Sequence, residues 1–135
     1  MREIPIHIAP LLAAALTRMI IGALWYSPML FLHAWHRVSG VSEAEMNAGI
    51  ARAVVIDLIG SLIMAFVLLH AVKYAGAATA AQGMAVGFFN WLGFVAVVTI
   101  GTVTYLRKPF QLFLIQNGYL LLSLLAMGAI LAVWG

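Results

Sequence analysis

Four long apolar runs, separated by short polar stretches, make up most of the chain. They occupy residues 6–27, 45–74, 80–106 and 109–134. Each run holds the roughly 20 mainly apolar residues that an α-helix needs to cross a bilayer. The pattern therefore predicts an all-α fold, an integral membrane bundle of four transmembrane helices that forms a single domain over residues 1–135.

A shorter amphipathic stretch, residues 28–38, lies between the first two runs. Two aromatic residues close the first run, and a Ser-Pro pair then predicts an N-cap followed by Pro at the first helical position. The apolar residues that follow share one face, beside two histidines and Arg37. Aromatic and basic residues of this kind are typical of the membrane–water interface. We predict an interfacial helix here, with an interfacial motif made of Trp25, Tyr26, Ser27, Pro28 and Trp35.

The remaining connections carry clear turn and capping signals. Ser42 and Glu45 have the spacing of a capping box, which predicts the start of the second long helix. Residues 75–79 read as a small-residue turn. Residues 107–109 predict a tight turn, with Pro109 at the first position of the fourth helix, so the third and fourth helices should be antiparallel neighbours.

The composition indicates that lipid, not water, surrounds most of the chain. Of the 135 residues, 65% are hydrophobic and 8% are charged, whereas a water-soluble domain has roughly 25% charged residues. The net charge of +3 comes from seven Lys and Arg residues scattered along the chain. This distribution favours membrane lipids as partners over nucleic acid. The absence of Cys excludes disulfides, thiolate metal sites and a cysteine nucleophile.

The basic residues also predict an orientation. Arg2 and Lys73 fall on one side of the predicted bundle. The other side has Arg37, Arg52, Arg107 and Lys108. Because basic residues concentrate in cytoplasmic loops, the first and third loops are expected in the cytoplasm and both termini outside.

Small and polar residues recur at helical spacing in the predicted spans. In the third span, one face is expected to carry Gly83, Gly87, Asn90, Phe94, Val97, Gly101 and Thr104. The corresponding faces of the first and second spans are Ala15, Arg18, Gly22 and Trp25, and Gly49, Ala53, Asp57, Ser61 and Met64. Small residues let helix backbones approach closely in lipid. We favour packing within one bundle, and a homo-oligomer formed through these small-residue faces is the alternative.

Arg18 and Asp57 are ionisable residues inside predicted spans, where a charge costs several kcal/mol unless it finds a partner. Arg18 lies seven residues before Trp25, and Asp57 lies five after Arg52. Because the first two spans run antiparallel, both side chains should lie at similar depth below one membrane face. We predict that they pair directly or through a water. Such a pair either fixes helix register or forms the polar floor of a ligand or ion cavity, and unpaired snorkelling is the third alternative.

The fourth span adds further polar residues at the same membrane depth. Gln116, Tyr119 and Ser123 share a face, Asn117 is adjacent, and Thr99 or Thr102 could join them. Interhelical hydrogen bonding accounts for these residues, with ligand binding as the alternative. The candidate intramembrane polar cluster is Arg18, Asp57, Gln116, Asn117 and Tyr119.

No motif in the sequence indicates enzyme chemistry or a cofactor. His33 and His36 have a spacing that could chelate a metal, but Glu43 and Glu45 are the only nearby residues that could complete the site. We therefore predict no metal site. There is no HExxH motif, no phosphate-binding glycine loop and no pair of carboxylates at shared depth, and neither Ser27 nor Ser61 has an evident activating base. We expect a non-enzymatic protein with no catalytic residues.

Several short motifs resemble those of a known family. They are the run from Gly22 to Pro28 with Leu30, Phe31 and Trp35, the stretch 91–94, the stretch from Lys108 to Tyr119, and residues 127–130 before Trp134. Together they resemble the domain-of-unknown-function 1761 family of small bacterial multi-pass membrane proteins. The resemblance implies a four-span bacterial membrane protein and carries no established activity. We expect the protein in the bacterial inner membrane. Arg18 is outside these motifs.

Three classes of function agree with these features. The leading hypothesis is a protein that binds or transports a small hydrophobic or ionic ligand, whose identity the sequence does not give. The second is an interaction or lipid-organising protein that uses the interfacial helix. The third, by size alone, is a proton-coupled exporter similar to the small multidrug resistance family, which would require a carboxylate in the first span, where this chain has Arg18.

Overall fold

The computed structural model describes residues 3–135, and Arg2, which enters the charge count above, lies outside them. The described residues form helices and loops without strands. The elements are α1 (Ile8–Trp25), α2 (Leu32–Ser39), α3 (Glu43–Tyr74), α4 (Ala80–Trp91), the π-helix η1 (Leu92–Ala96), α5 (Val97–Thr99), α6 (Gly101–Thr104) and α7 (Phe110–Val133).

Four helical segments are long and apolar enough to cross a membrane. They are Ile8–Trp25, Glu43–Tyr74, Ala80–Thr104 and Phe110–Val133. The third of these is the nearly continuous rod made by α4, η1, α5 and α6. The predicted all-α fold with four helices of spanning length is confirmed, and the helix ends differ from the prediction by only a few residues.

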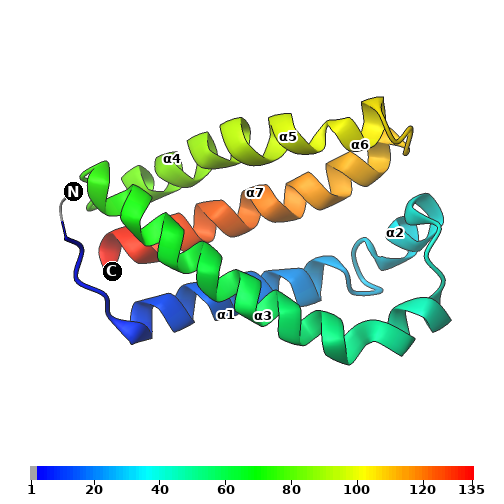
Figure 1. Ribbon diagram of the computed structural model, residues 1–135, viewed down its shortest axis with the longest axis horizontal. Helices are drawn as coiled ribbons and strands as arrows, with labels where there is room; N and C mark the ends of the chain where they lie inside the picture. Colours follow the sequence, from blue (N-terminus) through cyan, green and yellow to red (C-terminus); the bar gives the residue numbers. More distant parts are fainter. Residues whose placement is uncertain (1–2) are drawn as a thin grey trace.

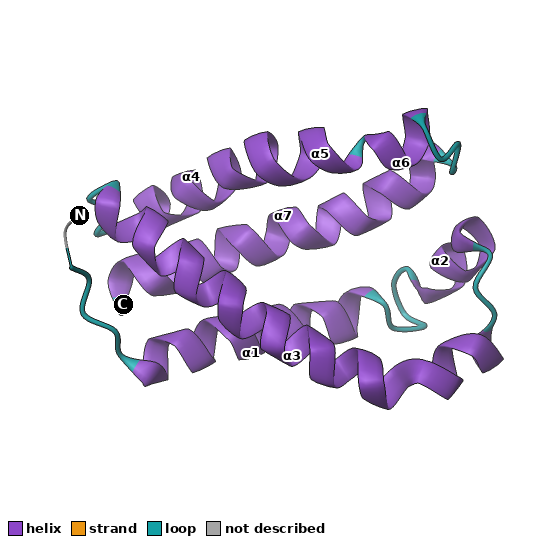
Figure 2. Ribbon diagram, viewed as in Figure 1, coloured by secondary structure: helices purple, strands orange, loops and turns teal. Residues whose placement is uncertain are grey.

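Helix α7 is the centre of the bundle and packs against α1, α3 and α4. Figure 1 shows the C-terminus and the start of α1 at one end of the molecule, with α2 and the turn between α6 and α7 at the other. The helices separate toward this second end, where the first turns of α3 lie far from α6 (Figures 1 and 2). We call the two halves the core end and the α2 end.

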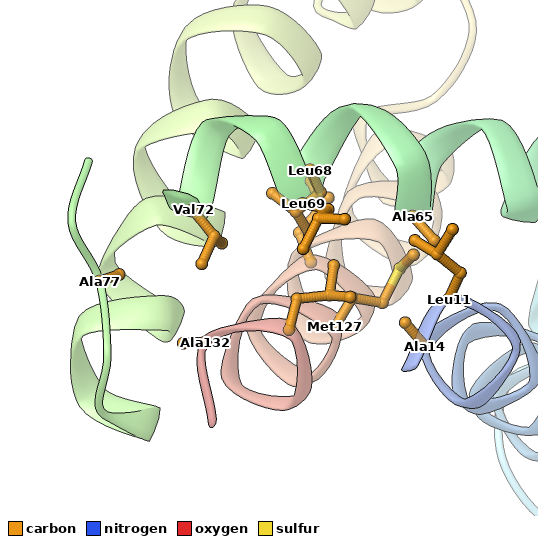
Figure 3. Close-up of a cluster of buried hydrophobic side chains, with 11 residues drawn as sticks. Leu11, Ala14, Ala65, Leu68, Leu69, Val72, Ala77, Met127 and Ala132 are labelled. Carbon is orange, nitrogen blue, oxygen red and sulfur yellow. The ribbon is translucent and has the colours of Figure 1, made fainter. Parts of the chain in front are cut away.

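The hydrophobic core fills the core end (Figure 3). Leu69, Val72, Met127 and Leu131 are each at most 1% exposed. In Figure 3, Leu69 of α3 and Met127 of α7 extend into the space between these two helices. Leu11 from the first turns of α1 packs against the same cluster. Because these side chains occupy the space between the helices, the core end is closed.

Glycines allow α4 and α7 to approach at the level of their backbones. A Cβ built on Gly83 would lie 2.1 Å from the carbonyl oxygen of Gly128, and one built on Gly87 would lie 2.2 Å from that of Leu124. The GxxxG step that the sequence revealed is therefore used within the chain, between α4 and α7, and this part of the small-residue face is not available to a second copy.

The face predicted for the third span is wrong beyond Trp91. Phe94 and Val97 are 76% and 63% exposed, whereas Ala96 is buried. The reason is the π-helix η1, in which the extra residue per turn rotates every later side chain around the axis. As a result Thr99 faces α7, a position that a regular 3.6-residue period does not give.

The connection between α1 and α2 also differs from the prediction. Helix α2 begins at Leu32 and not at Pro28, and Ser27 is not its N-cap. Instead, the Ser27 hydroxyl donates to the Leu24 carbonyl at 2.7 Å, and the Phe31 N–H donates to the Trp25 carbonyl at 3.0 Å. The chain needs residues 26–31 as a turn because α2 packs back toward α7. The placement of α2 at a membrane interface stays a prediction.

The other turn predictions hold with small differences. The Ser42–Glu45 capping box is present at the start of α3, and Pro109 occupies the N-cap of α7 instead of its first helical position. A second capping box, Thr79 with Gln82, starts α4 and was not predicted. Its T-x-x-Q spacing was visible in the sequence.

Candidate functional site

Arg18 of α1 and Asp57 of α3 form an ion pair. The Arg18 Nη1 donates to Asp57 Oδ1 at 2.7 Å and to Ser61 Oγ at 2.7 Å. Arg18 is 9% exposed, whereas the Asp57 side chain is 44% exposed. The direct pairing that the sequence predicted is therefore present. It places the two residues at one depth in the bundle, with the guanidinium inside and the carboxylate partly open.

Tyr119 of α7 completes the surroundings of Arg18. The guanidinium carbon lies 5.3 Å from the centre of the Tyr119 ring, a distance at which a cation is attracted by the π-system. The Tyr119 hydroxyl donates to the Arg18 carbonyl at 3.4 Å. The Arg18 Nε is buried and has no hydrogen-bond partner among the described residues. Arg18 of α1 thus contacts α3 through the ion pair and α7 through Tyr119.

Gly22 and Gly118 allow the aromatic rings to reach these positions. A Cβ on Gly22 would come within 3.0 Å of the Tyr119 hydroxyl oxygen, and one on Gly118 within 2.8 Å of the Trp25 ring. The Trp25 indole N–H donates to the Ile115 carbonyl at 2.8 Å. The end of α1 is therefore fixed to α7 by ring packing and one hydrogen bond.

The other aromatic residues of the predicted interfacial motif face the bundle. Tyr26 makes edge-to-face contacts with Tyr119, at 5.6 Å between ring centres, and with Trp35, at 6.1 Å. Trp25 packs against Phe31 at 4.6 Å. Of the five predicted motif residues, Pro28 is exposed, and Ser27 caps the end of α1.

Asn117 and Gln116 lie on the side of α7 toward the α5 segment. The Asn117 Nδ2 donates to Thr99 Oγ1 at 3.0 Å and to the Phe113 carbonyl at 3.2 Å. The sequence predicted Thr99 or Thr102 as a partner in this cluster, and in the structure the partner is Thr99. Gln116 lies between two cavities and contributes to both.

Two cavities open beside the polar cluster, at the α2 end. The larger, about 650 Å³, lies between α1, α2, α3 and α7, and Tyr26, Trp35, Asp57, Gln116 and Tyr119 are among the residues that line it. The smaller, about 280 Å³, is lined by Tyr26, Thr99, Gln116, Asn117, Tyr119 and Leu120. The two cavities share Tyr26, Gln116 and Tyr119. All five residues of the predicted cluster therefore lie in or directly behind one cavity system.

Sequence reasoning missed the role of Ser61. It was placed on the Asp57 face of the second span but not as a partner of the ion pair. Because Ser61 follows Asp57 by one helical turn and is fully buried, it shares the guanidinium of Arg18 with the carboxylate. The i, i+4 spacing of the two residues was the available signal.

His33 and His36, the two histidines considered for a metal site, have different environments. The His36 Nδ1 bonds the Val41 carbonyl at 2.7 Å, whereas His33 is exposed. Within residues 3–135, no three His, Cys, Asp or Glu side chains come together in a way that could hold a metal ion. His36 therefore ties α2 to the following loop.

Comparison with known protein families finds one family model that matches most of the chain. A family model described as a protein of unknown function (DUF1761) matches residues 9–132. The chain belongs to this family. Neither the curated proteins nor the solved structures that were compared contain a match. The motifs that carried the DUF1761 resemblance have a place in the structure. Gly22, Tyr26 and Tyr119 line the larger cavity, the Trp25 ring packs against Gly118, and the stretch 91–94 includes the first three residues of the π-helix η1.

Proposed function

We propose that this DUF1761 protein is a non-enzymatic integral membrane protein that binds a small hydrophobic or ionic ligand in the larger cavity. The observation that carries the proposal is the cavity of about 650 Å³, in which Asp57 is partly exposed among apolar and aromatic side chains. Ligand sites are concave, mainly apolar and contain a few polar groups that fix orientation. The volume is in the range of such sites.

The closed core end supports access from one membrane face. Leu69, Met127 and Leu131 fill the space between α3 and α7 on one side of Arg18, and the cavity lies on the other. Arg52 and Arg107 belong to the cavity side, so the positive-inside rule puts the cavity toward the cytoplasm, with both termini outside. We place the protein in a bacterial inner membrane. Transport of the ligand would require a second conformation in which the core end opens. Ligand binding is therefore the first part of the proposal, and transport is the second.

The alternative is an interaction or lipid-organising protein that uses α2 and the turn before it. Met29 is 91% exposed and Leu30 is 53% exposed, so this turn offers an apolar surface to lipid. In contrast, Phe31 and Trp35, which the alternative would place in lipid, pack on Trp25 and Tyr26. The aromatic residues thus support a cavity wall more than a membrane-contact surface.

A cavity-filling pair of variants tests the proposal. Ala53 lines the cavity, and Ala51 is exposed on the same helix outside it. The full chain, its Ala53→Phe variant and its Ala51→Phe variant are purified in nanodiscs, and native mass spectrometry measures small molecules that stay bound. We expect a bound molecule on the unsubstituted chain and on Ala51→Phe, and loss of at least 80% of it on Ala53→Phe. Equal retention by both variants, or lipid as the only bound species in all three samples, contradicts the proposal.

A further inference from the structure

We infer that the ligand is an organic cation with an apolar body, whose charged group lies against the carboxylate of Asp57 and the rings of Tyr26, Trp35 and Tyr119. This inference rests on the proposed function, because it requires that the larger cavity binds a ligand. It adds the chemical class of that ligand.

The charge of the cavity lining is the first argument. Asp57 lines the cavity, and the other lining residues include no Lys, Arg, His or Glu. Arg18, the partner of Asp57, is 9% exposed and lies behind the lining. The last turn of α1, where a helix dipole is negative, also borders the cavity through Gly22 and Ala23. A ligand therefore meets negative potential, although the ion pair as a whole is neutral.

The carboxylate is also incompletely satisfied. The hydrogen bonds of the described residues reach Asp57 through Oδ1, which accepts from the Arg18 Nη1. With 44% of its side chain exposed, Asp57 presents the rest of the carboxylate to the cavity. A carboxylate in apolar surroundings needs compensating positive charge or hydrogen-bond donors. A positively charged ligand group supplies this compensation.

The aromatic residues select an organic cation. Tyr26, Trp35 and Tyr119 line one wall, with Tyr26 in edge-to-face contact with both other rings. Tyr119 already holds the Arg18 guanidinium at 5.3 Å, which shows that its ring suits a cation. Aromatic walls recognise alkylated ammonium groups through cation–π attraction. Metal cations such as Ca²⁺ and Mg²⁺ instead require about six oxygen ligands, with carboxylates among them. The cavity has one carboxylate, from Asp57, beside the Gln116 amide and two phenols. This lining therefore favours an organic cation over a metal ion.

The rest of the cavity fits an apolar body. Met19, Ile50 and Val54 are among the lining residues from α1 and α3, and Leu32 belongs to α2. Burying apolar ligand surface against such side chains is favourable because it removes that surface from water. A small hydrophilic cation would leave this surface without a partner, so the geometry favours a lipophilic one.

A matched pair of probes separates charge from shape. Phenyltrimethylammonium is a cation, and tert-butylbenzene has the same shape without charge. The chain has no Cys, so Ala53→Cys places a single thiol in the cavity and Ala51→Cys places one outside it as the control. The full chains are reconstituted in phosphatidylcholine nanodiscs, which carry no net charge. The rate of alkylation by N-ethylmaleimide is measured with each probe.

We expect phenyltrimethylammonium to slow alkylation of the thiol at position 53 at least fivefold and to leave the thiol at position 51 unchanged. tert-Butylbenzene should slow the reaction at position 53 less than twofold. Equal protection by both probes overturns the cationic class and leaves the proposed ligand cavity standing. Absence of protection by either probe overturns this inference, whereas the proposed function is judged separately by the bound molecules in the cavity-filling experiment.

Three further variants test the roles of Asp57 and Trp35. In the Ala53→Cys background, Arg18→Met combined with Asp57→Asn removes both charges without leaving an unpaired one, and protection by the cation should fall below twofold. Trp35→Leu should weaken protection severalfold, and Trp35→Phe should restore it. Full protection in the chain that lacks both charges contradicts the role of Asp57. Alkylation of folded chain is compared after size-exclusion chromatography, so a misfolded variant is recognised.

Discussion

Arg18 on α1 and Asp57 on α3 are 39 positions apart in the chain, and their side chains meet at 2.7 Å. The two residues differ in exposure, because the guanidinium is buried against Tyr119 and the carboxylate faces the larger cavity. The relation between the two side chains therefore links the stability of the bundle to its candidate ligand site.

Removing one charge should cost more stability than removing both. Arg18→Leu leaves the Asp57 carboxylate without its partner and should lower the free energy of unfolding by about 3 kcal/mol. Replacing Arg18 and Asp57 together by Leu should recover about 2 kcal/mol of this loss. Unfolding of the reconstituted chain by sodium dodecyl sulfate, followed by circular dichroism, measures both values. Equal losses in the single and double variants would show that the pair does not act as a unit.

The indole of Trp25 should contribute more to the free energy of unfolding than the indole of Trp91. The Trp25 N–H donates to the Ile115 carbonyl at 2.8 Å, whereas the Trp91 N–H is buried without a partner among the described residues. Trp25→Phe should therefore destabilise the chain by about 1 kcal/mol. Trp91→Phe loses ring contacts with Phe88 but no hydrogen bond, so its loss of stability should be the smaller of the two. The same unfolding measurement decides, and a larger loss for Trp91→Phe would contradict this contact pattern.

Close packing of α4 on α7 should make Gly87 intolerant of even one methyl group. The Cβ of Gly87→Ala would lie 2.2 Å from the Leu124 carbonyl oxygen, so the helices must separate, at a cost of about 2 kcal/mol. Gly60 of α3 has nothing within 4 Å of an added Cβ. Gly60→Ala is therefore the matched control and should be neutral or slightly stabilising. Thermal unfolding of both variants in nanodiscs tests this, and similar midpoints would remove the proposed contact.

The apolar runs and their connections could be predicted from the sequence because lipid imposes a simple rule. A spanning segment must satisfy its own backbone and be long enough to cross, so residues 45–74 read directly as a helix. Arg18 and Asp57 could be paired for a related reason. Charges in lipid need a partner, and their distances from Trp25 and Arg52 gave their depths.

Other features depended on tertiary contacts that periodicity does not contain. The π-helix η1 moved Phe94 away from the packed face and brought Thr99 to Asn117, a change of register that no local propensity predicts. Ser27 and Pro28 have the sequence of a helix start. They form a turn because the chain must reverse between Trp25 and Leu32. The volume and lining of the cavities likewise depend on the divergence of helices at the α2 end.

The central claim is that the cavity opens to one membrane face, and thiol labelling from each face tests this claim most directly. Single thiols at Ala53→Cys, in the cavity, and Ala78→Cys, in the loop after α3, are exposed to a membrane-impermeant maleimide in sealed right-side-out and inverted vesicles. The account predicts labelling of position 53 only in inverted vesicles and of position 78 only in right-side-out vesicles. Labelling of both positions from the same face would contradict a membrane crossing by α3 and a cavity that opens to the cytoplasm alone.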